Sequence, residues 1–264
     1  MNEREKAELF RSLHVKGSPV ILFNIWDAGS ARTLAQAGAK AIATGSWSVA
    51  AAHGFDDGET IPLELVLANI KRIADSVSLP VTLDFETGYA TDLSVLKDNI
   101  RNVIAAGAVG INFEDRIIGA DALQTIEDQS ARIRAIRDAA EATGIPIYIN
   151  ARTDVFLKTY PAKHDEGQLE EALERAAGYA EAGASGLFAP GLRDPELIEK
   201  LCERTHLPVN ILVLPDTPPT KTMAQLGVAR ISYGGAPYRQ MSAALTEAAQ
   251  KAFADGFAQK VSNY

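Results

Sequence analysis

The segments LPVTLDFETGYA (residues 79–90) and AAGAVGINFED (residues 105–115) show the two ways in which this chain begins a buried strand. In the first segment, Pro80 directly precedes an apolar run, and proline is tolerated at the first residue of a strand, where no donor to the ladder is needed. In the second, Gly107 closes a helical stretch, as glycine does in its left-handed conformation. Both runs end in acidic residues.

The same two junctions alternate along the whole chain. Proline precedes the odd-numbered candidate strands (Pro19, Pro80, Pro146 and Pro208), and glycine closes the helix before the even-numbered ones (Gly38, Gly107, Gly183 and Gly227). The candidate strands are residues 20–26, 41–45, 81–86, 110–114, 147–151, 186–189, 209–214 and 229–233, and a helical stretch follows each. Eight such units predict an α/β fold, a (β/α)8 TIM barrel in one domain spanning residues 1–264, with an open doubly wound sheet as the alternative.

Composition narrows the class of protein. With 264 residues, 47% hydrophobic and 23% charged, the chain is typical of a globular protein, and no apolar run reaches the roughly 20 residues of a membrane helix. A net charge of −8 offers no general attraction to nucleic acid. The single cysteine, Cys202, excludes an internal disulfide, and the opening MNEREKAELF lacks the apolar core of a signal peptide. These features predict a cytoplasmic location.

The end of the chain, residues 237–264, is alanine-rich and predicts a terminal helix beyond the eighth strand. It could pack on its own barrel or reach a neighbouring subunit.

Acidic residues gather where the active site of such a barrel lies, at the carboxyl ends of the strands. Asp84 and Glu86 are two apart on one predicted strand and should face the same side, and Glu114 ends the next strand. Unpaired carboxylates repel one another and favour a neutralising cation, and an all-oxygen ligand set favours Mg²⁺ or Mn²⁺. The alternative is a salt-bridge network with Arg116 and Arg152.

Candidate anion-binding groups follow other strands. Arg152, in the sequence NARTD, could bind a substrate carboxylate or phosphate with its planar fork, or pair with Glu114. The backbone amides around Ser46 and Trp47 could hold a second anionic oxygen, or form a simple turn. Gly234 and Gly235 follow the eighth strand, where many barrels bind phosphate.

Several motifs together resemble the isocitrate lyase and phosphoenolpyruvate mutase superfamily: NIWDAGSA (24–31), FDDGE (55–59), LDFETGYA (83–90), GINFED (110–115), INARTD (149–154) and VNIL (209–212). The resemblance implies a Mg²⁺-dependent enzyme that makes or breaks a bond beside the α-carbon of a 2-oxo acid through an enolate. It implies that Asp84 binds the ion and that Glu86, Glu114 and Asp57 hold its waters. It further implies that Arg152, Ser46, Trp47 and Asn210 bind the substrate, and that the protein is a homo-oligomer, a dimer or a tetramer with the terminal helix exchanged.

The loop after the fourth strand, DRIIGADALQTIEDQ (115–129), departs from the superfamily pattern. It contains no Cys, His or Lys, whereas the related lyases carry K-[KR]-C-G-H there and the phosphonate-processing members a Lys, an Asn and a Ser. Decarboxylation of a 3-carboxy-2-oxo acid such as oxaloacetate requires only an electron sink and, later, a proton.

We therefore predict a carbon–carbon lyase or decarboxylase of a small 2-oxo or 2-hydroxy di- or tricarboxylic acid. In a lyase, water, Tyr89 or Asp57 would carry the proton. The alternatives are an enzyme like phosphoenolpyruvate mutase or phosphonopyruvate hydrolase, a 2-oxo acid binding protein with little turnover, and a sugar-phosphate enzyme that uses the pair Gly234 and Gly235.

Overall fold

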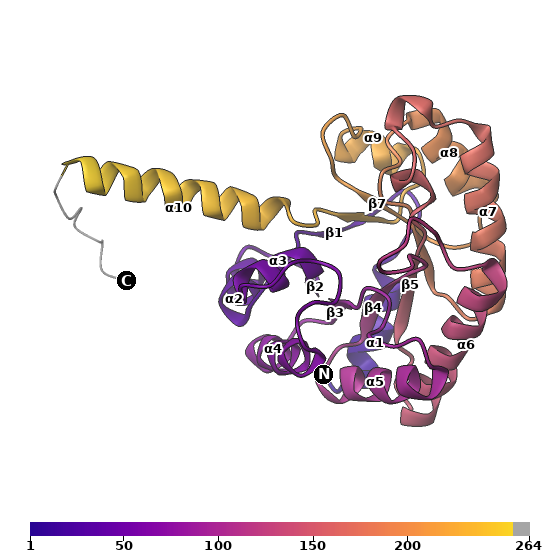
Figure 1. The fold of residues 1–264 in the computed structure, drawn as a ribbon, viewed down its shortest axis with the longest axis horizontal. Coiled ribbons are helices and arrows are strands. Elements are labelled where there is room, and N and C mark those ends of the chain that lie inside the picture. Colours follow the sequence, from indigo (N-terminus) through magenta and orange to yellow (C-terminus); the bar gives the residue numbers. More distant parts are fainter. Residues whose placement is uncertain (256–264) are drawn as a thin grey trace.

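Eight strands, all parallel, form the centre of the molecule in the order β1-β8-β7-β6-β5-β4-β3-β2 (Figure 1). This arrangement is seen in a computed structural model that describes residues 1–255. The sheet closes on itself just beyond β1, where Ile25 bridges Thr44 and donates its amide to the Ala43 carbonyl at 2.8 Å. The predicted (β/α)8 TIM barrel is therefore confirmed, and the open sheet is excluded.

The helices lie around the barrel in alternation with the strands. The strands are β1 (Val20–Leu22), β2 (Ile42–Ala43), β3 (Val81–Asp84), β4 (Gly110–Glu114), β5 (Tyr148–Arg152), β6 (Gly186–Phe188), β7 (Val209–Leu212) and β8 (Arg230–Ser232). The α-helices are α1 (Glu3–Ser12), α2 (Ala28–Gln36), α3 (Ser46–Ala52), α4 (Leu63–Ser76), α5 (Leu93–Ala105), α6 (Ile126–Thr143), α7 (Glu166–Glu181), α8 (Pro195–Arg204), α9 (Thr220–Gln225) and α10 (Ala236–Asp255), with short 3₁₀ turns at Val155–Leu157 and Pro161–Lys163.

The predicted junctions are present in the backbone. Gly38, Gly107, Gly183 and Gly227 have φ values of 92°, 98°, 100° and 91°, the left-handed conformation that ends a helix. The fourth strand matches its predicted bounds residue for residue. The first and third end earlier than predicted, at Leu22 and Asp84 instead of residues 26 and 86. Backbone hydrogen bonds to the neighbouring strands still occur beyond these ends, as between Glu86 and Glu114.

Helix α1 covers the amino-terminal end of the barrel. Phe10 is fully buried and packs edge-on against Tyr148 of β5, with ring centroids 5.5 Å apart, in a small cluster with Val20 and Val109. Because these residues come from the beginnings of several strands, α1 closes the end of the barrel opposite the predicted active site.

Helix α10 leaves the barrel and projects as a single rod (Figure 1). Leu245 and Phe253 on it are 65% and 83% exposed. The helix begins at Ala236, close to the predicted residue 237, and the rest of that prediction, residues 256–264, lies outside the described residues. Within residues 1–255, every helix is too short or too polar to cross a membrane.

The burial of Phe10 yields a prediction about stability. Phe10→Ala should lower the free energy of unfolding by about 3–5 kcal/mol, because it opens a cavity between α1 and the strand ends. Chemical denaturation followed by circular dichroism measures this value. Glu8→Ala, at an exposed position of the same helix, is the control and should change stability by less than about 0.5 kcal/mol. Equal losses in the two variants would contradict a closing role for α1.

Candidate active site

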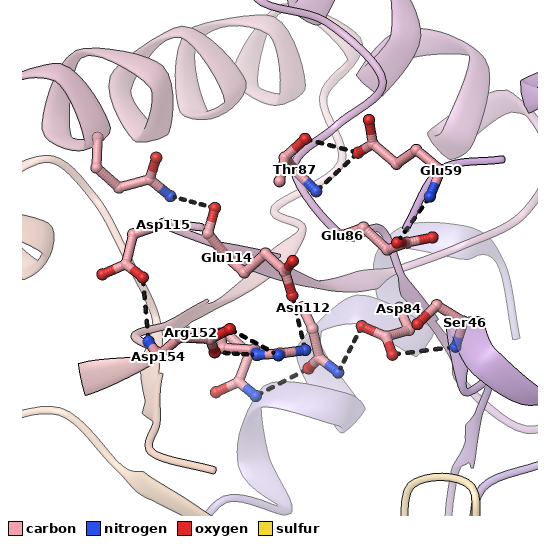
Figure 2. A network of polar contacts seen from close by, with 12 residues as sticks. Ser46, Glu59, Asp84, Glu86, Thr87, Asn112, Glu114, Asp115, Arg152 and Asp154 are labelled. Atoms are coloured by element: carbon pink, nitrogen blue, oxygen red, sulfur yellow. Dashed lines mark hydrogen bonds and ion pairs between the residues drawn. The ribbon is translucent and has the colours of Figure 1, made fainter. Parts of the chain in front are cut away.

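The carboxylate of Asp84 lies at the carboxyl end of β3, between two donors (Figure 2). The Ser46 amide, at the first residue of α3, donates to Asp84 Oδ2 at 3.1 Å, and Asn112 Nδ2 on β4 donates to Oδ1 at 3.4 Å. The sequence left open whether the amides around Ser46 hold a substrate oxygen or form a simple turn. In the structure, the Ser46 amide donates to Asp84.

Glu86 reaches the same region by a route that strand alternation did not predict. β3 ends at Asp84, and Glu86 has φ 50°, so the expectation that the two acids face one side because they share a strand is wrong. Glu59 and Tyr89 also adopt positive φ values of 60° and 55°. Three non-glycine residues in this costly conformation stand close together at the carboxyl end of the barrel.

Reciprocal hydrogen bonds through Glu59 hold this strained turn (Figure 2). The Glu59 amide donates to Glu86 Oε2 at 3.0 Å. In return, Glu59 Oε1 accepts from the amide and hydroxyl of Thr87, both at 2.8 Å, and from the Tyr89 amide at 3.0 Å. The loop that contains FDDGE and the turn after β3 therefore fix each other, which places Glu86 beside Asp84.

The acids at this end of the barrel are short of positive charge. Burial and the nearby charges of Asp84, Asp57 and Glu114 raise the pKa of Glu86 to about 8. Asp57 keeps exposed surface, yet partial desolvation and the charge of Asp84 also raise its pKa. Buried carboxyl groups whose pKa is raised by neighbouring carboxylates favour the binding of a cation.

Arg152 is already paired. Its Nη1 lies 2.6 Å from Glu114 Oε2, and its Nε and Nη2 donate to the two oxygens of Asp154 at 2.6 and 2.9 Å (Figure 2). Burial raises the pKa of Glu114 to about 7 against the opposing charge of Arg152. For Glu114, the structure thus shows the predicted alternative, a salt bridge with Arg152. Arg116 has no such contact and is exposed.

Other predicted residues lie at the edges of this arrangement. Trp47 packs under Arg239 of α10, whose guanidinium carbon is 4.9 Å from its ring centroid. Asn210 is fully buried on β7 and accepts from the Ser232 hydroxyl at 3.1 Å, while its amide donor has no partner within residues 1–255.

The turn after β8 is not a free phosphate cradle. The amides of Tyr233 and Gly234 both donate to Asn24 Oδ1, at 2.9 and 2.8 Å. Of the Gly234 and Gly235 amides that the sugar-phosphate alternative would use, the first is therefore already bound to Asn24.

The donor chemistry fits a hydrated divalent cation. Asp57, Asp84 and Glu86 offer only oxygen ligands, and no Lys or Arg pairs with any of them in residues 1–255. Those residues contain no group of three or more His, Cys, Asp or Glu side chains close enough to hold an ion together. These donors therefore suit an ion that binds few side chains directly and keeps several of its waters, as Mg²⁺ commonly does.

Sequence reasoning missed Glu59 and Arg230 and assigned no role to Asp154. Glu59 lies inside the quoted FDDGE loop, and its position two residues beyond Asp57 was the only available signal. Asp154 is one of the polar residues at the end of the fifth predicted strand, and its spacing of two from Arg152 suits a local ion pair. Arg230, whose guanidinium lies inside the barrel, gave no signal, because its segment VARIS is typical of an ordinary buried strand.

An acidic site at the carboxyl ends of a (β/α)8 barrel defines the class of protein, a barrel enzyme. The family model for phosphoenolpyruvate phosphomutase matches residues 10–253, and the chain belongs to this family, within the isocitrate lyase and phosphoenolpyruvate mutase superfamily. This confirms the resemblance seen in the sequence. Its relatives include lyases and mutases that act on small carboxylates.

Two characterised relatives cover most of the chain. The 2-methylisocitrate lyase of Escherichia coli strain K12 is 30% identical over 257 residues, 92% of this chain and 83% of the relative. The oxaloacetate decarboxylase of Pseudomonas entomophila strain L48 is 28% identical over 238 residues, 87% of this chain and 78% of the relative. The superfamily therefore contains both of the reaction types that the sequence predicts.

Solved structures agree on the fold. A putative phosphonomutase from Burkholderia cenocepacia J2315 superimposes with a TM-score of 0.93 at 47% identity, covering 95% of this chain and 99% of that one. A phosphonopyruvate hydrolase in complex with oxalate and Mg²⁺ has a TM-score of 0.84 at 22% identity, covering 97% and 89% of the two chains, which shows likeness of fold alone.

The raised pKa of Glu86 predicts a pH-dependent stability. Between about pH 4.5 and 8 the folded protein holds a proton that the unfolded chain has released, so stability falls as the pH rises through this window. Added Mg²⁺ should oppose the fall, because it binds the charged form. Thermal denaturation from pH 5 to 8.5, with and without MgCl₂, measures both effects.

Two variants serve as the comparison for this experiment. Glu86→Gln should flatten the pH dependence, whereas Glu174→Gln, at an exposed position of α7, should leave it as in the unaltered protein. A melting temperature that rises toward pH 8 without metal would count against an uncompensated carboxyl group at position 86.

Proposed function

We propose that this protein is a Mg²⁺-dependent carbon–carbon lyase or decarboxylase that acts on a small 2-oxo or 2-hydroxy di- or tricarboxylic acid through an enolate. The observation that carries the proposal is the group of carboxylates Asp57, Asp84 and Glu86, which lack a cationic partner at the carboxyl end of the barrel. Family membership adds the reaction class.

The ion would be held by Asp84, with Glu86 and Asp57 accepting from its waters, and Mn²⁺ could replace Mg²⁺. When bound, it supplies electrostatic stabilisation of the negative charge that develops on the 2-oxo oxygen of the substrate. The chain itself keeps Asp84 in place through the Ser46 amide and positions Glu86 through Glu59.

Arg152 would act on the substrate as the centre of a charged triad. Because Glu114 and Asp154 fix its plane, its remaining N–H groups have a defined direction in which to meet a substrate carboxylate. A pocket of about 460 Å³ borders Arg152 and continues along the loop after β4, over residues 119–123. This pocket would receive the part of the substrate distant from the 2-oxo group.

The two candidate reactions, lyase cleavage and decarboxylation, differ in the proton transfer that they require. The loop after β4 carries no Cys, His or Lys that could serve as an acid. The Tyr89 hydroxyl lies 3.5 Å from Glu86 Oε1. Burial, together with the charges of Glu86 and Glu59, raises the pKa of Tyr89. A neutral Tyr89 could donate a proton to a leaving carbanion or enolate. Decarboxylation needs such a donor only after CO₂ has left.

An assay tests the proposed function directly. Purified protein with Mg²⁺ should release pyruvate from oxaloacetate or a 2-methylisocitrate-like acid, and EDTA should abolish the release. Asp84→Asn should lower kcat/KM by at least about 100-fold with no loss of melting temperature, because the substitution removes charge stabilisation and also relieves repulsion. Asp56→Asn, in the exposed part of the neighbouring loop, is the matched control. Absence of EDTA-sensitive turnover on every 2-oxo and 2-hydroxy acid tried would refute the proposal.

A second candidate has one specific observation in its favour. The putative phosphonomutase from Burkholderia cenocepacia is 47% identical over nearly the whole chain. Phosphonopyruvate and phosphoenolpyruvate therefore belong in the same assay, followed by phosphorus NMR. Binding of these acids without any product would instead support a 2-oxo acid binding protein with little turnover, through a ligand-dependent rise in melting temperature.

We further propose that copies of the chain assemble into a dimer or tetramer by exchange of α10. The helix projects from its own barrel (Figure 1), and its apolar side chains Leu245 and Phe253 are exposed. A groove of about 650 Å³ runs along the outside of β1, bordered by apolar residues that include Val15, Ile21, Phe23 and Leu34. The two features are complementary, since each leaves apolar surface in water that the other could cover.

Solution mass tests the exchange. The unaltered chain should elute as an oligomer in size-exclusion chromatography with light scattering, and Leu245→Glu should shift the mass toward that of the monomer. Gln250→Glu adds the same charge on another face of α10 and serves as the control. A monomeric unaltered chain, or an oligomer indifferent to Leu245→Glu, would argue against exchange of this helix.

A further inference from the structure

We infer that Arg230 is a positioning residue for the active site, which acts across the barrel interior by orienting the Asn112 amide against the carboxylate of Asp84. This inference rests on the proposed function, since it assigns Arg230 to the support of the proposed metal-binding carboxylate. Nothing in the sequence pattern of β8 suggests such a role.

The contact crosses the whole barrel. Arg230 belongs to β8 and Asn112 to β4, strands that stand four places apart in an eight-stranded ring and therefore face each other. Arg230 Nη2 nevertheless donates to Asn112 Oδ1 at 2.9 Å. The side chain of Asn112 then donates through Nδ2 to Asp84 Oδ1 at 3.4 Å (Figure 2). Arginine is long enough to span this interior while its stem remains buried.

The chemistry of the guanidinium decides which way the amide points. Arginine only donates, so it accepts the oxygen end of Asn112 and rejects the nitrogen end. Asn150 Nδ2 also donates to Asn112 Oδ1 at 2.9 Å. However, Asn150 could present its own unpartnered oxygen after a half-turn of its amide, so it fixes nothing by itself. With Arg230 in place, the NH₂ group of Asn112 must face Asp84.

The cost of keeping Arg230 here argues for a function. Its side chain is 1% exposed, forms no ion pair within residues 1–255, and leaves Nη1 without a partner. Its guanidinium lies 6.0 Å from the Phe10 ring centroid, and burial lowers its pKa to about 10, against the opposite influence of Tyr148 and Asp84. A buried charge without a salt bridge is expensive, and an apolar residue would be the stabilising choice for packing alone.

Metal affinity is the test, because a purely structural residue would change melting temperature and leave affinity alone. Isothermal titration of the full chain with Mg²⁺, and Mn²⁺ titration followed by electron paramagnetic resonance, give the Kd. Arg230→Met and Asn112→Leu should each weaken binding by about 10-fold or more, as loss of a group that supports a metal ligand commonly does. The double variant should be no weaker than Asn112→Leu, since the two residues act through one contact.

Two further variants complete the design. Arg230→Lys keeps a donor-only charge and should recover part of the affinity. Thr82→Val removes a hydroxyl that is buried in the same barrel interior without a partner, and it should leave the Kd unchanged. If Arg230→Met does not fold, Asn112→Leu and Arg230→Lys carry the test. A Kd unchanged in a folded Arg230→Met or in Asn112→Leu, or additive losses in the double variant, would overturn the inference.

Failure of the proposed function would appear separately, as an unaltered protein that binds neither ion. The crystal structure of Arg230→Met, or of Asn112→Leu where the first does not fold, then decides the inference without metal. A displaced Asp84 carboxylate would support it. An Asp84 in the same position as in the unaltered protein would overturn it.

Discussion

Negative charge gathered at the carboxyl ends of β3 and β4, with too little positive charge beside it, is the constraint on which the rest of this structure depends. Asp84 and Glu86 stand together there, and burial together with the charge of Asp84 raises the pKa of Glu86. A protein can keep such a group only if the surrounding backbone and side chains hold it against repulsion. The Ser46 amide, the loop anchored by Glu59 and the amide of Asn112 all serve this purpose. The barrel supplies their positions, because the ends of adjacent parallel strands meet at one rim.

The site divides into two halves with different electrostatics. On one side, Glu114 and Asp154 are neutralised by Arg152 in a compact triad, which is oriented before any ligand arrives. On the other, Asp57, Asp84 and Glu86 form no ion pair with Lys or Arg in residues 1–255, and burial raises the pKa of Asp57 and Glu86. A dicarboxylate would be repelled by this group of acids unless a divalent cation bound together with it or before it. This asymmetry connects the proposed metal requirement with the proposed substrate class, since the ion reverses the sign of the field that the substrate meets.

The sequence predicted the barrel well, because its proline and glycine junctions depend on local backbone chemistry that needs no knowledge of distant contacts. It also located Glu114, which ends β4 as expected, and Asp84, which ends β3 two residues before the predicted end. The prediction that Glu86 is placed by strand alternation was wrong, because its φ of 50° breaks the alternation and residue spacing does not reveal such a φ. The sequence left open whether Arg152 pairs with Glu114, because that depends on side-chain reach between β4 and β5. The span from Arg230 to Asn112 joins residues 118 positions apart and was invisible for the same reason.

The strained turn that carries Glu86 and Tyr89 bears on how this enzyme can evolve. Both positions adopt a conformation that glycine or asparagine would enter with less cost, so replacing either residue by one of these would relieve backbone strain. Glycine at position 86 would also remove a carboxylate that its neighbours repel. Selection for thermal robustness alone would therefore drive the chain toward a more durable barrel without its acid. Glutamate thus occupies position 86 at a cost in stability, both by conformation and by charge, as is expected where durability and chemistry compete.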